Sequence, residues 1–157
     1  DLLSSHTEVW GKATLTDTDF TLVGKADRVD VLHNGTARIF DYKTGALPSK
    51  AQQLHFDKQL LLEAEILQRG GFEGLSALQV AEATYIGVGN EPKLAKAPLD
   101  EDDVWIKFSQ LIKAYQNPIQ GYTARRAMLM VDVSSDYDQL ARYGEWGTNE
   151  SALLIKT

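Results

Sequence analysis

The sequence predicts one domain of the α+β or α/β class. Residues 7–43 are of β type, residues 50–69 and 100–116 have helical composition and spacing, and neither a repeat nor a linker interrupts the 157 residues. A chain of this length is usual for one domain and buries roughly two thirds of its unfolded surface. We therefore expect a single domain over residues 1–157. Because the chain begins with Asp1 and not with methionine, we expect it to be a fragment of a longer protein.

The composition excludes several classes of protein and several kinds of site. No apolar run approaches the ~20 residues that a membrane helix needs, which excludes a spanning helix. The net charge of −6 disfavours a broad basic surface for nucleic acid, so any phosphate contact requires a local patch, a metal ion or a partner. Cysteine is absent, which excludes disulfides, thiolate catalysis and iron–sulfur clusters and fits a reducing interior.

Four strands are expected. They cover residues 7–15, 20–32, 36–43 and 78–88, and the second and third are joined by His33-Asn34-Gly35, a hairpin turn signal. A loop is expected over residues 44–49 and another, rich in Gly, Asn and Pro, after residue 88.

Two long helices are expected as well. The first runs over residues 50–69 and ends at Gly70-Gly71, and the second is capped by Asp100 and runs to about residue 116. In the tail we expect a short strand over 127–133 and a short helix over 137–142.

The turn decides where Asp27 points. A two-residue Asn34-Gly35 turn places Asp27 opposite Tyr42, whereas a three-residue loop with a left-handed Gly35 places it opposite Asp41. We predict the three-residue loop, because it gives one face a coherent pattern. That face comprises Val23, Lys25, Asp27, Val29 and Val31 on one strand and Ala37, Ile39, Asp41 and Lys43 on the other.

Two facing carboxylates repel each other unless something offsets their charge. A divalent metal such as Mg²⁺ does so, and Lys43 beside it could orient a water or stabilise a pentavalent phosphate. The residues alone leave two interpretations open: a metal-dependent phosphoryl-transfer site, and a solvated strand edge.

Three segments carry a family resemblance: GKADRVD, RIFDYKTG and KQLLLEAEILQRGGF, all within residues 23–72. They resemble the PD-(D/E)xK nuclease superfamily, its RecB type, and most closely the C-terminal nuclease domains of the AddB type. The segment DYDQLAR at 136–142 also resembles the end of AddB chains.

The resemblance implies an α/β fold with a mixed central sheet flanked by helices. It implies that Asp27 and Asp41 bind the metal with the carbonyl of Tyr42, that Lys43 is the catalytic lysine, and that Gln59 positions the lysine or the DNA. The implied activity is Mg²⁺-dependent hydrolysis of DNA, with Mn²⁺ as a substitute, by an exonuclease acting in double-strand break repair. The implied partners are DNA and an AddA-type helicase subunit that uses ATP, in the bacterial cytoplasm at the nucleoid, without a membrane.

The sequence departs from the family pattern in three places. Glu63 stands where the glutamine motif usually has tyrosine, the four cysteines of many AddB nuclease domains are absent, and the chain has little room for the usual first helix. Either His6 or Glu8 replaces the acid or histidine of that helix, or the helix lies upstream.

Weaker candidates complete the set. Thr44 and Gly45 could offer backbone N–H groups to a phosphate, and Arg125 and Arg126 could clamp DNA. Arg28 is expected to pair with Asp30 on the opposite face. A nuclease outside break repair and a catalytically silent module that positions DNA or braces a helicase subunit remain as alternative functions.

Overall fold

The computed structural model describes residues 1–16, 18–89, 91–100, 103–121, 138–140, 142 and 145. The chain divides into two compact units, residues 1–113 and 114–157. The expected tail strand, Arg125, Arg126 and most of the expected tail helix lie outside the described residues. No helix within the described ranges is long and apolar enough to cross a membrane.

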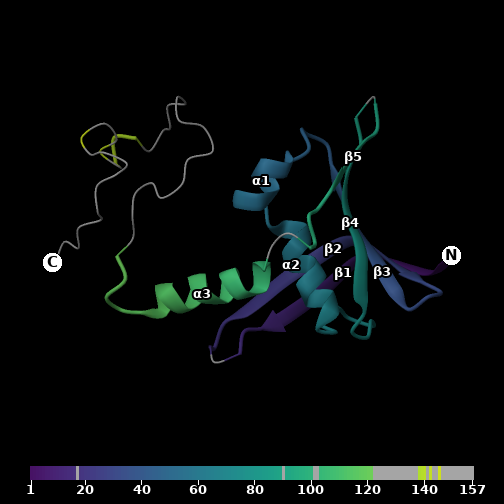
Figure 1. Cartoon of the computed structure of the whole chain (residues 1–157), viewed down its shortest axis with the longest axis horizontal. Coiled ribbons are helices and arrows are strands. Elements are labelled where there is room, and N and C mark those ends of the chain that lie inside the picture. The colour runs from purple at the N-terminus through teal and green to yellow at the C-terminus, as the bar shows by residue number, and fades with distance from the viewer. Residues whose placement is uncertain are drawn as a thin grey trace. The chain divides into compact units, whose positions relative to one another are not determined.

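The first unit is built on a five-stranded mixed sheet, which confirms the predicted fold class (Figure 1). Its strands lie in chain order, and only β3 and β4 are parallel neighbours. The strands are β1 (Leu2–Thr14), β2 (Thr21–Leu32), β3 (Thr36–Lys43), β4 (Gln79–Gly87) and β5 (Lys93–Lys96).

Helices fill the connection between the two parallel strands, as a crossover requires. They are α1 (Lys50–His55) and α2 (Gln59–Gln68), and α3 (Val104–Gln116) follows β5. Helix α2 lies across one face of the sheet (Figure 1) and buries Leu60, Ala64 and Leu67 against it. This packing places the first residue of α2 near the carboxyl end of β3.

The predicted hairpin register is confirmed. Val29 pairs with Ile39 and Val31 with Ala37, so the loop between β2 and β3 has three residues. Gly35 has a φ of +81°, and its N–H donates to the carbonyl of Leu32 over 3.0 Å. Glycine adopts this left-handed conformation without the steric cost that a Cβ brings.

The predicted shared face is correct for β3 but wrong for the first half of β2. Ala37, Ile39 and Asp41 are buried as expected, whereas Val23 and Lys25 are exposed. The buried positions of β2 shift by one between Ala26 and Val29, directly around Asp27. On the neighbouring strand β1 the less exposed positions also shift by one, between His6 and Val9, and Glu8 between them has a φ of +57°. This break in the alternation was not visible in the sequence.

The predicted helix over residues 50–69 is broken into α1 and α2. The N–H groups of Phe56 and Asp57 both donate to the carbonyl of Gln52, which closes α1. The Asp57 carboxylate accepts a 2.5 Å hydrogen bond from the hydroxyl of buried Tyr85, a tertiary contact that holds residue 57 outside both helices.

Three smaller predictions also need correction. Strand β1 begins at Leu2 rather than residue 7, and β5 occupies a segment predicted as loop. Helix α3 begins at Val104, so Asp100 is too far upstream to be its N-cap.

The left-handed turn gives a stability prediction. Gly35→Ala is expected to lower the free energy of unfolding by about 1 kcal/mol, because alanine pays a steric cost at this φ. Chemical denaturation measures the difference. Gly45→Ala is the matched control, since Gly45 has no left-handed φ and a Cβ added there would meet no atom within 4 Å. Equal stability of both variants would contradict the turn assignment.

Candidate active site

Asp41 and Lys43 lie at the carboxyl end of β3. They share a face with buried Ala37 and Ile39 because side chains alternate along a strand. Asp41 is only 3% exposed, and Lys43 Nζ lies 2.9 Å from its Oδ2. A buried carboxylate is costly unless it is paired, so the lysine offsets the charge of Asp41.

Gln59 joins this pair to α2. Its Oε1 accepts a 2.8 Å hydrogen bond from Lys43 Nζ, and its Nε2 donates to Asp41 Oδ1 over 2.6 Å. The same Nε2 lies 3.1 Å from Oε1 of Glu63, one helical turn further on. One amide side chain thus contacts both acids and the lysine, and both of its polar atoms are used.

Asp27 lies beside the pair on β2. The β2–β3 ladder is defined as far as Arg28 opposite Phe40, so Asp27 comes next, toward Asp41. Its Oδ2 accepts a 2.9 Å hydrogen bond from the backbone N–H of Tyr42. This bond anchors the Asp27 carboxylate on the main chain between Asp41 and Lys43.

The acids influence one another electrostatically. Burial raises the pKa of Asp41, and the charge of Asp27 adds to this, while Lys43 and Gln59 oppose it. Burial also raises the pKa of Glu63 to about 7, with further contributions from the charges of Asp41 and Asp27. In both residues the cost of burying a charged carboxylate outweighs the groups that favour ionisation, which for Asp41 include the Lys43 ammonium.

Tyr85, on the neighbouring strand β4, packs against the acids and the lysine. None of the sequence motifs predicted this residue. It is 1% exposed, pairs with Asp41 in the parallel register of β3 and β4, and places its ring 5.5 Å from Lys43 Nζ. Burial raises its pKa, as does its hydrogen bond to Asp57. The alternating segment 79–87 is consistent with an inward Tyr85, but only the pairing of β4 with β3 brings the ring to the lysine.

The acids suit a divalent cation. Glu63 Oε2 is buried and has no hydrogen-bond partner in the described part of the chain, and Asp41 Oδ2 has only the Lys43 ammonium beside it. Carboxylate oxygens are the ligands that Mg²⁺ prefers, usually one or two of them with waters completing the shell. Among the described residues, no three His, Asp or Glu side chains already converge as a full metal cage. The candidate ligands are therefore the pair Asp27 and Asp41, a number of carboxylates that Mg²⁺ accepts when waters complete its shell.

The other candidates make contacts of their own or lie in an exposed loop. Glu8 forms an ion pair with Lys25, and His6 exchanges a 3.0 Å hydrogen bond with Ser4. Thr44 and Gly45 are exposed in the loop after Lys43.

The predicted pairing of Arg28 with Asp30 is confirmed. The guanidinium donates from Nε and Nη2 to the two carboxylate oxygens over 2.8 and 2.7 Å. Ser5 adds a 2.7 Å hydrogen bond to the same carboxylate. This structural network stabilises β1 against β2.

The raised pKa of Glu63 predicts a pH-dependent stability. In the folded, metal-free protein Glu63 holds its proton up to about pH 7, whereas in the unfolded chain it ionises near 4.5. The folded state thus binds more protons between these values, and stability falls as the pH rises through them, by about 3 kcal/mol from this group.

Glu63→Gln is expected to remove the contribution of Glu63 to the dependence of the free energy of unfolding on pH. Denaturation of the metal-free protein between pH 4.5 and 7.5 measures it. Glu65→Gln is the control, because Glu65 is on the same helix but pairs with Arg69. A Glu63→Gln slope equal to that of the wild type would contradict the assignment.

Comparisons with known proteins identify the family. A family model described as the PD-(D/E)XK nuclease superfamily matches residues 3–138. The chain is 33% identical to an uncharacterized protein of Rickettsia conorii over 63 residues, which are 40% of this chain and 8% of the relative. It is 32% identical to an uncharacterized protein of Rickettsia typhi over 73 residues, 45% of this chain and 8% of the relative. It is 36% identical to an uncharacterized protein of Rickettsia felis over 55 residues, 34% of this chain and 6% of the relative.

The matched segment thus spans less than a tenth of the length of these curated relatives. No solved structure matches the chain. The mixed sheet, the acids at the end of β3 and the extent of the family match lead to one conclusion: this chain belongs to the PD-(D/E)xK nuclease superfamily.

Proposed function

We propose that this chain is a Mg²⁺-dependent nuclease domain that hydrolyses DNA phosphodiester bonds as part of an AddB-type helicase–nuclease. The observation that carries the proposal is the contact of one glutamine, Gln59, with Asp41, Lys43 and Glu63 at the end of β3. In a chain of this superfamily, a costly buried arrangement of acids and a lysine is best explained by catalysis.

Asp27 and Asp41 would hold the metal. Further oxygen donors would be the Tyr42 carbonyl and Glu63 Oε2, which has no hydrogen-bond partner among the described residues. A bound Mg²⁺ supplies positive charge to the scissile phosphate and lowers the pKa of water. In the hydrolysis, a water oxygen bonds to phosphorus, the bond to one ester oxygen breaks, and the leaving oxygen takes up a proton.

Lys43 acts on the water and the phosphate. Its ammonium group would donate hydrogen bonds to the attacking water or to a non-bridging oxygen, stabilising charge that develops in the transition state. Gln59 and the face of the Tyr85 ring restrict where this ammonium can lie. Gln59 is therefore a positioning residue, because it acts through Lys43 and Asp41.

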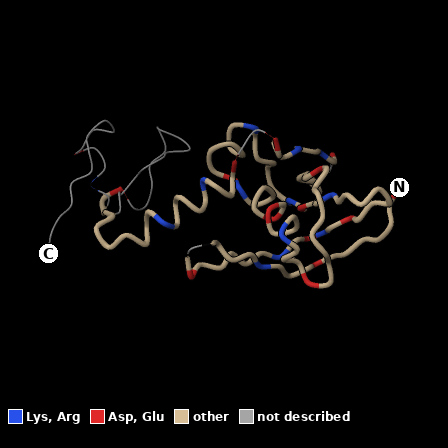
Figure 2. Tube along the Cα trace, turned by 60° about the horizontal axis from the view of Figure 1, so that its bottom comes forward, with Lys and Arg blue, Asp and Glu red and all other residues tan. Residues whose placement is uncertain are grey.

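The distribution of charge favours a domain that receives DNA from a larger assembly. Lys and Arg are interspersed with Asp and Glu along the described trace (Figure 2), and the net charge is −6. Such a surface captures DNA weakly by itself. The proposed partner is an AddA-type helicase subunit that hydrolyses ATP and delivers a strand, and the proposed setting is exonucleolytic processing of double-strand breaks in the bacterial cytoplasm.

One observation favours the alternative of a silent module. In this structure the Lys43 ammonium is already engaged by Asp41 and Gln59, so the network is closed without substrate. A module of this kind would position DNA or brace the helicase without cutting. Activity measurements separate the two functions.

Lys43→Ala tests the proposal. In the intact protein with its helicase partner, cleavage of linear duplex and single-stranded DNA with Mg²⁺ or Mn²⁺ is expected to fall by about 10²- to 10⁴-fold, because the donor to the transition state is lost. Lys12→Ala is the control, since Lys12 is exposed on β1. It should cut at the wild-type rate.

Two outcomes would contradict the proposal. Equal rates for Lys43→Ala and the wild type, with folding verified by circular dichroism, would exclude Lys43 from the chemistry. Absence of cutting by the wild-type complex with either metal would favour the silent module.

A further inference from the structure

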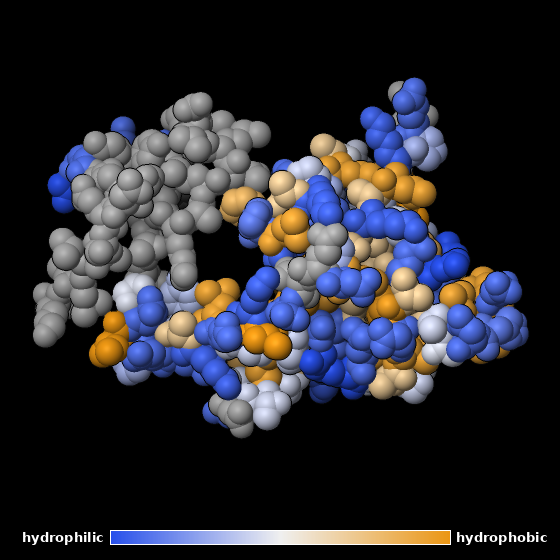
Figure 3. Space-filling view, viewed as in Figure 1, coloured by the Kyte–Doolittle hydropathy of each residue, from blue (hydrophilic) through white to orange (hydrophobic). Residues whose placement is uncertain are grey.

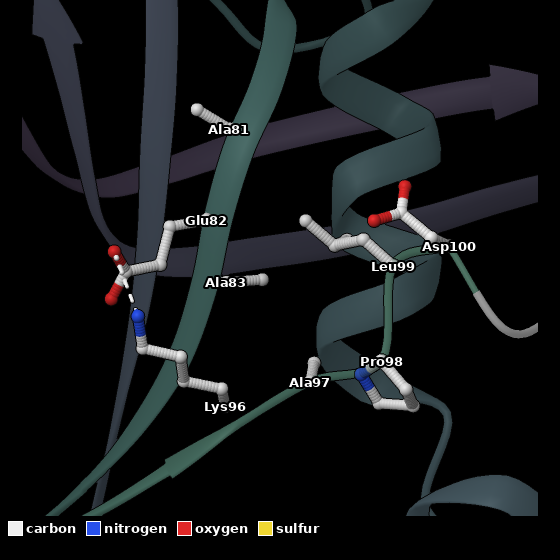
Figure 4. Close-up of a pocket in the computed structure, with 8 residues that line it drawn as sticks. All are labelled: Ala81, Glu82, Ala83, Lys96, Ala97, Pro98, Leu99 and Asp100. Atoms are coloured by element: carbon white, nitrogen blue, oxygen red, sulfur yellow. Dashed lines mark ion pairs between the residues drawn. The ribbon is translucent and has the colours of Figure 1, made fainter.

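A groove adjoins the candidate active site beyond the carboxyl ends of β3 and β4. Its volume is about 620 Å³, and its walls are the loop after Lys43 and the hairpin between β4 and β5. The residues that line it include Thr44, Gly45, Leu47, Gly87, Glu91 and Lys93. A smaller cavity of about 190 Å³ lies further along β4, where its one lysine, Lys96, already pairs with Glu82 (Figure 4). The larger groove is therefore the stronger candidate for a ligand.

The groove opens on the same face as Lys43. Gly87 pairs with Lys43 in the parallel register, and the N–H of Val88 donates to the Lys43 carbonyl over 3.0 Å. Because side chains alternate along β4, Gly87 faces the same side as Tyr85, which contacts Lys43. A ligand in the groove would thus extend directly into the site of the acids and the lysine.

Gly87 lies in the floor of the groove and is buried there between Leu47 and Lys93. A Cβ added there would lie 3.5 Å from the Leu47 side chain and 3.6 Å from Lys93 Cβ, which is ordinary contact. Alanine therefore fits at this position, whereas a larger side chain would extend into the groove.

The lining combines the chemistry that a nucleotide needs. Leu47 offers apolar surface, Lys93 offers an ammonium group, and the loop residues Thr44 and Gly45 offer exposed backbone. Lys93 has no ion pair among the described residues, in contrast to Lys96 on the same strand. Figure 3 shows apolar surface directly below the hydrophilic tip of the β4–β5 hairpin.

We propose that this groove holds a single-stranded segment of nucleic acid, one or two nucleotides from the scissile phosphate. The inference rests on the proposed nuclease function and specifies its substrate. A cavity of this size suits a ligand of a few hundred cubic ångströms, which a nucleotide is and a duplex is not. Lys93 would bind a phosphate, and Leu47 would contact a base or sugar. Glu91 in the same lining limits the affinity.

The test measures binding without cleavage. A fluorescein-labelled oligothymidine is titrated with the intact protein in EDTA, and anisotropy is read at several salt concentrations. Lys93→Ala is expected to weaken binding by about fivefold and to reduce the slope of log K against log salt by about 0.7, the loss of one phosphate contact on a single strand. Lys96→Ala is the matched control and should bind as the wild type does, because Lys96 points to the other face of the sheet, where it pairs with Glu82 (Figure 4).

A further variant tests whether the free volume of the groove is needed for binding. Gly87→Val is expected to weaken oligothymidine binding by about fivefold or more, because its side chain would fill part of the groove. Lys96→Ala again serves as the control, and circular dichroism verifies that Gly87→Val is folded. A blunt hairpin duplex should compete poorly with the oligothymidine.

The outcomes distinguish the proposal about the groove from the proposal about nuclease activity. Equal affinities and salt slopes for Lys93→Ala and Lys96→Ala, with Gly87→Val binding as the wild type, would overturn the groove even if DNA is cut normally. Loss of binding in Lys93→Ala and Gly87→Val supports the groove even if the wild type proves unable to cut DNA, which would contradict the nuclease alone.

Discussion

The burial of the Asp41 carboxylate is the constraint on which the rest of the site depends. Asp41 occupies a row of β3 whose other members, Ala37 and Ile39, are fully buried core residues. An ionised group in such a row must be paired and hydrogen-bonded, or it takes up a proton. Lys43 and Gln59 meet that need from two different elements, and so the carboxylate fixes where α2 begins relative to the sheet.

The apolar core holds α2 in this position. The helix lies close to β1 and β2 because glycines stand where it crosses them: a Cβ on Gly11 would lie 2.9 Å from the Ile66 side chain, and one on Gly24 would lie 3.2 Å from it. Larger residues at these points would push the helix outward and draw Gln59 away from Asp41. The packing of the core and the chemistry of the site are therefore coupled through one helix.

Much of the hairpin and of the candidate site could be predicted from the sequence. The physical reasons differ between the elements. The hairpin register followed from Gly35 and from the need for one coherent buried face, and β3 was predicted to its ends. Asp27 could be placed toward Asp41 because only a turn and two neighbouring strands were involved. The proximity of Gln59 to Lys43 came from family resemblance, since no periodicity relates a helix to a strand sixteen residues away.

What escaped prediction depends on tertiary contacts. The break between α1 and α2 is associated with the Tyr85–Asp57 hydrogen bond, which joins residues 28 positions apart. The shift of the buried positions in β2 coincides with the positive φ of Glu8 on the neighbouring strand. Composition at residues 56–58 and 26–29 carries no signal for either, because the residue that accompanies each feature lies far away in the chain.

We propose that the acids at the end of β3 form a divalent metal site. Anomalous diffraction from crystals of the intact protein grown with Mn²⁺ tests this directly. We expect a manganese peak between the carboxylates of Asp27 and Asp41, within reach of Glu63. Clear density for both carboxylates with no manganese between them, and with Lys43 still paired to Asp41, would contradict it.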